Sequence, residues 1–247
     1  MVLRITAIVC AAVSMLSCGP APFDPNTSSE YITAIVDPAA VPYAGIEVPL
    51  KDNIALVTDG GMQAVEFRIL PSQPLKNNGI RAEIAVDYPY VAHDTIEYTW
   101  DMKLVDPFPT DAQNRWWLIA QWHDQPDRNL NQTWDNFPSH SPPISLGFGQ
   151  TNGSRAIALT YGTVQGPAGH FPVSTEQWYS FSAKITWSQD NTGSITLTVS
   201  PGNVSITTNG PNMYNAFQHY FKTGMYRNKD IASENRVRIR NIKMRKW

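Results

Sequence analysis

The chain has 247 residues, a length that one large β domain can fill. Hydrophobic residues make up 42% and charged residues 16%, which is too apolar for a disordered chain and too mixed for a polytopic membrane protein. The net charge of −2 excludes a general nucleic-acid binder, because phosphate binding needs a basic surface. The two cysteines, Cys10 and Cys18, both lie near the N-terminus, so no disulfide framework is expected.

Residues 1–17 are predicted to be a signal peptide of the lipoprotein type. Arg4 supplies a positive start, and a short apolar run over residues 5–16 leads to Ser17 and Cys18. The run is too short to span a bilayer, and a small residue followed by Cys resembles the bacterial lipoprotein signal. Cys18 is therefore the expected lipidation residue. The mature protein is expected to be exported and held at the bacterial outer membrane only by this lipid. The alternative is an ordinary secretory signal with a chance cysteine.

The rest of the chain is predicted to be a tether over residues 18–29 and a single β domain over residues 30–247. The tether segment is rich in Pro, Ala, Asn and Ser. In the domain, apolar and polar residues alternate with period two, which is typical of half-buried strands. In chain order, the predicted strands are 64–70, 80–86, 96–104, 116–123, 144–149, 156–162, 180–187, 194–199, 204–208, 218–226 and 236–244. Many short strands without helical periodicity predict an all-β jelly-roll sandwich of two antiparallel sheets.

Polar side chains interrupt the apolar alternation on three of the predicted strands. Alternate positions of a strand point to the same face, so the polar residues of one strand gather on one side. The residues that share a face are Trp117, Gln121 and His123, then Tyr220, Lys222 and Tyr226, and in a third strand Arg81 and Glu83. These faces predict a groove for an anionic, hydroxyl-rich polymer, since cationic, imidazole and phenolic groups suit binding and proton transfer. The polar segment from Asp124 to Pro143 is predicted to be a loop beside this groove.

Three motifs carry a resemblance to the jelly-roll polysaccharide lyases. They are Arg81-Ala82-Glu83-Ile84, Gln121-Trp122-His123 and Tyr220-Phe221-Lys222-Thr223-Gly224-Met225-Tyr226, in that order. They resemble R-(S/T)-E-L, Q-(I/V)-H and Y-F-K-A-G-x-Y of the alginate lyases. The chain departs from those enzymes at Ala85, where they often have Arg, and at Arg227-Asn228, where they favour Asn-Gln. Its Gln-Trp-His-Asp and Tyr226-Arg227 look closer to heparin lyase I and glucuronan lyase. The fold that the resemblance implies is concanavalin A-like.

The resemblance implies β-elimination in a uronic acid-containing polysaccharide such as glucuronan, alginate or a heparin-like chain, with unsaturated oligosaccharides as products. Arg81 and Gln121 would neutralise the sugar carboxylate, so that negative charge can spread into it as the ring proton leaves. His123 and Tyr226 would serve as base and acid, in an order that the residues leave open. The residues expected to bind substrate are Lys222, Tyr220, Arg227 and Trp117.

Two other functions stay open. A non-catalytic glycan-binding lipoprotein would use the same aromatic and cationic groove. A glycoside hydrolase on a similar sandwich needs two carboxylates that flank the bond, and the chain has no E-x-D-x-x-E strand signature. Trp116 and Trp134 are further candidates for stacking on sugar rings, although core packing competes for aromatic residues.

No cofactor is required by the expected chemistry, and the chain is expected to work as a monomer on an anionic polysaccharide. The sequence has no zinc or EF-hand motif, so no metal-binding residue is predicted. Related lyases can carry a structural calcium ion, but no acidic cluster in the sequence gives it a position. The remaining histidines, interpreted as surface or loop residues, are His93, His140, His170 and His219, with His140 in the loop beside the groove.

Overall fold

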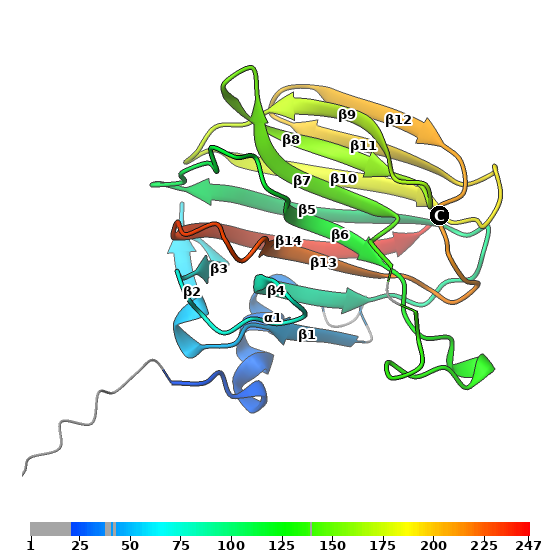
Figure 1. Ribbon diagram of the computed structural model, residues 1–247, viewed down its shortest axis with the longest axis horizontal. Coiled ribbons are helices and arrows are strands. Elements are labelled where there is room, and N and C mark those ends of the chain that lie inside the picture. Colours follow the sequence, from blue (N-terminus) through cyan, green and yellow to red (C-terminus); the bar gives the residue numbers. More distant parts are fainter. Residues whose placement is uncertain (1–20, 38–40, 42, 139) are drawn as a thin grey trace, which may run out of the picture.

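The computed structural model describes residues 21–37, 41, 43–138 and 140–247. Two seven-stranded antiparallel sheets lie one over the other, which confirms the predicted jelly-roll sandwich (Figure 1). The predicted signal peptide over residues 1–17 and the predicted lipidation residue Cys18 lie outside the described residues. None of the described helices is long and apolar enough to cross a membrane.

The first sheet is called the groove sheet and the second the outer sheet. In spatial order, the groove sheet contains β1 (Tyr43–Glu47), β4 (Ile80–Asp87), β13 (Tyr220–Arg227), β6 (Trp117–His123), β7 (Ile144–Thr151), β8 (Ser154–Tyr161) and β9 (Gly166–Pro172). The outer sheet contains β12 (Val204–Asn209), β11 (Ser194–Ser200), β10 (Trp178–Thr186), β5 (Thr95–Val105), β14 (Asn235–Lys246), β3 (Met62–Ile69) and β2 (Ile54–Asp59).

All eleven predicted strands are present, with ends within two residues of the prediction, among the fourteen described. The three strands that the sequence pattern did not predict are β1, β2 and β9. β1 has only five residues, too few for alternation to stand out. β9 contains Gly and Pro, which weaken the strand signal but are tolerated because β9 is an edge strand.

The N-terminal part of the described chain is helical, and this differs from the predicted tether. A 3-10 turn over Pro25–Thr27 leads into α1 (Ser28–Ile35), in which Tyr31 and Ile35 are buried. α1 contacts β1, β3 and β14, and main-chain hydrogen bonds join Ala21 and Phe23 to Lys51 and Pro49. This segment is therefore attached to the sandwich and is not a free tether. A helix of eight residues is too short for its periodicity to be visible in the sequence. Two further 3-10 turns lie at Lys51–Asn53 and Arg128–Leu130.

Large aromatic side chains fill the space between the sheets and fix the strands that carry the site. Trp100 of β5 stacks on Phe181 of β10 at 4.8 Å and meets Trp122 of β6 edge-on at 6.0 Å, as measured between ring centroids. Phe221 of β13 lies 5.0 Å from Trp122. Since neighbouring residues of a strand face opposite ways, burying Trp122 turns Gln121 and His123 to the open face of the groove sheet.

Two irregularities change the alternation near the site. The register of β6 shifts between Leu118 and Ala120, so positions before the shift face the opposite way from those predicted. The register of β13 shifts against β6 between Thr223 and Tyr226, where Gly224 has a φ of +138°. A side chain at Gly224 would place its Cβ 2.3 Å from the main-chain oxygen of Ala82, so only glycine fits here.

Candidate active site

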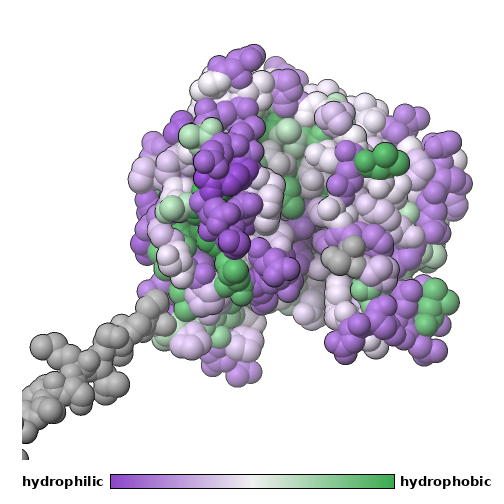
Figure 2. Space-filling model, viewed as in Figure 1, coloured by the Kyte–Doolittle hydropathy of each residue, from purple (hydrophilic) through white to green (hydrophobic). Residues whose placement is uncertain are grey.

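Four side chains from two adjacent strands meet on the open face of the groove sheet. Lys222 is the cross-strand partner of Gln121, and Tyr220 is the partner of His123. The rings of His123 and Tyr220 lie 6.0 Å apart. In the space-filling view this face is hollowed near its middle, between projecting and mostly hydrophilic parts (Figure 2). The imidazole, phenol, amide and ammonium groups therefore form one cluster.

Buried charges behind this cluster fix the position of the amide. Nε2 of Gln121 donates a hydrogen bond to Oε1 of Glu83 at 2.8 Å, and Arg81 lies 3.4 Å from the other Glu83 oxygen. The Glu83 side chain has no exposed surface, and this burial raises its pKa. Arg81 is 4% exposed and is paired with Glu47 and Glu83, so it lies behind Gln121. Its direct contact with a sugar carboxylate stays a prediction.

Glu47 joins the cluster although sequence analysis did not find it. Nζ of Lys222 lies 2.8 Å from Oε1 and 3.0 Å from Oε2 of Glu47, and Arg81 also donates to Oε2. Burial alone would raise the pKa of Glu47, but the charges of Lys222 and Arg81 hold it at about 2. No local sequence pattern points to Glu47, because its position depends on the pairing of Glu47 with Glu83 across β1 and β4.

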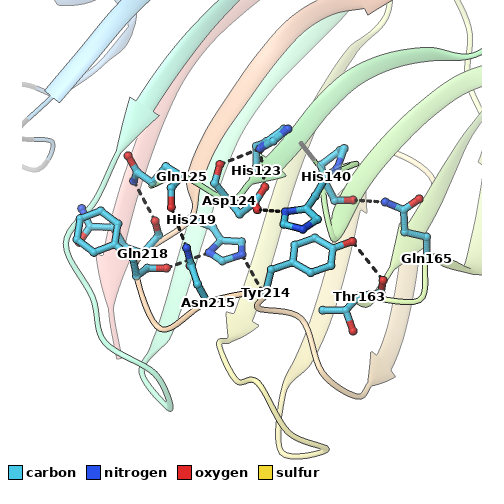
Figure 3. Close-up of polar contacts among 12 residues, drawn as sticks. His123, Asp124, Gln125, His140, Thr163, Gln165, Tyr214, Asn215, Gln218 and His219 are labelled. Carbon is cyan, nitrogen blue, oxygen red and sulfur yellow. Dashed lines mark hydrogen bonds and ion pairs between the residues drawn. The ribbon is translucent and has the colours of Figure 1, made fainter. Parts of the chain in front are cut away.

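The orientation of His123 follows from its contacts with Asp124. Nδ1 of His123 lies 2.8 Å from the Asp124 carboxylate and 2.8 Å from the Asp124 main-chain oxygen (Figure 3). Both neighbours are acceptors, so in the neutral ring Nδ1 carries the hydrogen and Nε2 keeps a free lone pair. A base needs such a lone pair, and Asp124 fixes the ring in that state.

The predicted loop beside the groove is tied to the same carboxylate. Nδ1 of His140 lies 2.6 Å from Asp124, and the His140 ring stacks on Tyr214 at 4.4 Å (Figure 3). Burial alone would raise the pKa of Asp124, but hydrogen bonds from His123 and His140 lower it. Trp134 of the loop lies 6.2 Å from Tyr220, between ring centroids, so the loop forms one wall of the site.

His219 lies in the loop before β13, as one of the two predicted alternatives, but it is buried and not at the surface. Its side chain is buried beside Trp187, with ring centroids 5.3 Å apart, and its main-chain N–H donates to the Tyr90 hydroxyl. Burial lowers the pKa of His219 to about 4, so the ring is neutral at neutral pH. His93 and His170 are exposed, as predicted.

Tyr226 lies apart from His123, and this corrects its predicted role as proton-transfer partner. It is six residues from Tyr220 along β13, about 20 Å at the usual rise of a strand. Its hydroxyl donates to the main-chain oxygen of Asn77, and Arg81 lies 4.0 Å above its ring. An acid and a base must reach adjacent atoms of one sugar. Tyr220, directly opposite His123, meets that requirement, whereas Tyr226 does not.

Arg227 and Trp117 face the interior of the sandwich. This contradicts the prediction that they bind substrate. The Arg227 guanidinium is fully buried, lies 4.7 Å from the Trp117 ring and donates to Ser233 and Asn235. Trp117 stacks on Phe108 at 5.4 Å between the sheets. For Trp117 the cause is the register shift in β6. For Arg227 the cause is ordinary alternation, which turns it away from Tyr226.

Replacing Arg227 by leucine is expected to lower the free energy of unfolding by about 2–4 kcal/mol. The reason is that the main-chain oxygens of Ile231 and Ser233 and the side-chain oxygen of Asn235 would lose the guanidinium as a donor. Urea unfolding followed by circular dichroism measures this loss. Arg245→Leu removes the same kind of side chain from an exposed ion pair with Glu97 and is expected to cost less than about 1 kcal/mol. Equal losses in both variants would contradict an internal role for Arg227.

The fold and the polar cluster together define a jelly-roll protein of the carbohydrate-active class. Residues 50–243 match the family model described as Polysaccharide lyase, so the chain belongs to that family and is a polysaccharide lyase enzyme. No curated protein matches the chain. Within the described residues, no group of three or more His, Cys, Asp or Glu side chains is arranged to hold a metal ion.

Solved structures with the same fold have low sequence identity to this chain. An endo-β-1,4-glucuronan lyase from the fungus Trichoderma reesei is 15% identical, with a TM-score of 0.55 over 77% of this chain and 85% of its own. An exolytic alginate lyase from Zobellia galactanivorans is 13% identical, with a TM-score of 0.54 over 86% and 96%. A β-glucanase catalytic domain from Podospora anserina is 12% identical, with a TM-score of 0.53 over 81% of each chain.

Proposed function

We propose that this lyase cleaves a uronic acid-containing polysaccharide, such as glucuronan, alginate or a heparin-like chain, by β-elimination. The observation that carries the proposal is the direct pairing of His123 with Tyr220, next to the paired Gln121 and Lys222. A base, an acid and two donors for a carboxylate are the groups that this elimination needs. On this sheet face His123 and Tyr220 are partly exposed, whereas Gln121 and Lys222 lie at the base of the cluster with 1% and 3% of their surface exposed.

In the proposed reaction, the sugar carboxylate accepts hydrogen bonds from Gln121 and Lys222, while Arg81 supports both from behind. Nε2 of His123 takes the proton from the ring carbon next to the carboxylate. The electron pair of that C–H bond forms the new C=C bond, and the pair of the breaking C–O bond goes to the glycosidic oxygen. The Tyr220 hydroxyl gives its proton to that oxygen. The proton held by His123 then returns to the Tyr220 phenolate through solvent, which restores the site.

The assignment of acid and base follows from the surroundings of the two groups. Burial raises the pKa of Tyr220, so its hydroxyl keeps a proton to donate. His123 presents its free Nε2, because Asp124 occupies Nδ1. Both groups rise from the same sheet face, so they approach a sugar ring from one side. That arrangement suits a syn elimination, in which the proton and the leaving oxygen depart on the same side of the ring.

The hydrolase alternative has little support in the carboxylates of the groove, despite the β-glucanase fold likeness. A glycosidase needs two carboxyl groups on either side of the scissile bond. Glu47 and Glu83 are the acidic residues of the cluster, and both are bound to Arg81. Glu83 is fully buried and cannot touch a substrate. A purely glycan-binding role would not need the Asp124-held imidazole beside a protonated phenol.

Incubating the folded protein with polyglucuronate, alginate and heparin is expected to produce ultraviolet absorbance from a new C=C bond beside a carboxylate with at least one polymer. Mass spectrometry of the products is expected to show oligosaccharides one water lighter than hydrolysis would give. Reducing ends without unsaturation would favour a hydrolase. Binding without any product would favour the glycan-binding alternative.

We also propose that the protein is exported and anchored by a lipid on Cys18, which rests on the sequence alone. The proposed elimination uses only side chains, so it requires no cofactor. All of these side chains belong to one chain, so a monomer is sufficient.

A further inference from the structure

We propose that the groove takes a polysaccharide whose uronates are separated by neutral sugars, instead of a polyuronate with a carboxylate on every ring. This inference rests on the proposed function and specifies its substrate class. It depends on the charges of the groove sheet, on the contacts of Glu47 and on the neutral surface beside the cluster.

The strands of the groove sheet have few cations for a sheet that binds a polyanion. They contain four Lys and Arg residues, of which Arg155 and Arg227 lie on the inner face. Only Arg81 and Lys222 belong to the open face. The same strands place three carboxylates on that face, namely Glu47, Glu83 and Asp87. The strands alone therefore offer no excess of positive charge.

Both of the open-face cations are already paired with one carboxylate. Glu47 accepts from Lys222 and from Arg81 and is more exposed than either, with 21% of its side chain accessible against 4% for each. A polymer therefore meets the Glu47 carboxylate at the surface before it reaches the two cations behind. One uronate can be held by Gln121 and Lys222 beside Glu47. A second uronate on the neighbouring ring would face Glu47 without a free cation.

Beyond Gln121, the next two strands of the groove sheet have small, neutral residues on the open face. The open-face positions of β7 and β8 next to the cluster are Ser145, Gly147, Ala158 and Thr160. Such positions leave room for sugar rings but provide no counterion for a carboxylate. Trp134, beside Tyr220, is 61% exposed, and Trp116, beside Tyr226, is 43% exposed. Indole rings bind the C–H faces of sugars without needing a charge.

Two cations in segments next to the groove strands, Arg115 and Lys229, are paired, whereas Arg128, in the loop that forms one wall of the site, is exposed and has no ion pair among the described residues. Arg115, beside Trp116, lies 3.1 Å from Asp111, and Lys229 lies 3.1 Å from Asp230. Together these features match a chain with one charged ring between neutral rings. Glu47 is then a specificity-determining residue, because its negative charge discourages a second carboxylate near the reacting sugar.

The test compares two forms of one polymer that differ only in charge density. Polyglucuronate and alginate are each used intact and after chemical reduction of about half of their carboxyl groups to alcohols, which keeps the backbone and the linkage. The rate of unsaturated-end formation is measured per remaining uronate. We expect the half-reduced form to be cleaved at least tenfold faster per uronate than the intact form. Equal rates, or faster cleavage of the intact form, would overturn the inference.

Two variants of matched charge test the role of Glu47. Glu47→Gln is expected to shift the preference at least threefold towards the intact polymer, because it frees Arg81 and Lys222. Glu97→Gln removes a carboxylate from the outer sheet, where Glu97 pairs with Arg245, and is expected to leave the preference unchanged. An unchanged preference in Glu47→Gln would overturn the assignment to Glu47. Unsaturated product from neither form of either polymer would count against the proposed function itself, a result distinct from a reversed preference.

Discussion

Replacing His123 by alanine is expected to lower kcat/KM for elimination by about 10²–10⁴-fold. Nδ1 of the imidazole hydrogen-bonds the main-chain oxygen of Asp124 and lies 2.8 Å from its carboxylate, which leaves the lone pair of Nε2 free to take a proton. Without the imidazole, only solvent is available to take the proton from the sugar ring. The rate of ultraviolet absorbance change on the polymer that gives product measures this loss.

The matched control for this variant is His170→Ala. His170 is an exposed histidine of β9, the edge strand far from β6 in the strand order of the groove sheet. It is expected to keep the wild-type rate within about twofold, because it touches none of the four clustered groups. Circular dichroism of both variants checks folding. A His123→Ala protein that is folded and retains the wild-type rate would exclude His123 as the base.

The second large effect is expected from one of two tyrosines in the same motif. Tyr220→Phe removes a hydroxyl opposite His123 and is expected to lower kcat by about 10²–10³-fold with little change in KM. Tyr226→Phe removes a hydroxyl that donates to the Asn77 main chain and is expected to change kcat by less than about fivefold. Steady-state kinetics of the two variants on one polymer give the comparison.

The two tyrosine variants separate the sequence-based hypothesis from the structural one. Each removes one oxygen from a half-buried ring of β13, so their effects on the core are similar. If Tyr226→Phe were the inactive variant and Tyr220→Phe the active one, the cross-strand pairing would not describe the catalytic site. If both variants kept the wild-type activity, neither tyrosine would be the acid.

The strands could be predicted because their signal is local. A run such as residues 96–104 alternates apolar and polar residues whatever it pairs with, and the structure has a strand there at Thr95–Val105. α1 and β1 escaped prediction because each is too short for a period to show. The prediction that Gln121 and His123 share a face was correct, since it needs only the alternation on one side of the register shift.

The site itself depends on pairing between distant strands, which local patterns do not contain. Alternation places Tyr220 and Tyr226 on the same face but does not say which of them lies opposite His123. That depends on the register of β13 against β6. The error for Trp117 has a similar cause, because a one-residue shift in β6 reverses every position before it. Glu47 reaches the cluster only through the pairing of β1 with β4.

Position 224, occupied by Gly224, tolerates almost no substitution. Any side chain there would push β13 away from the main-chain oxygen of Ala82 and the Cα atom of Glu83 on β4. The displaced strand carries Tyr220 and Lys222, so their alignment with β6 would change while the aromatic core could still hold the sheets together. In a saturation library of this gene, substitutions at residue 224 should therefore yield soluble proteins that no longer turn over polymer.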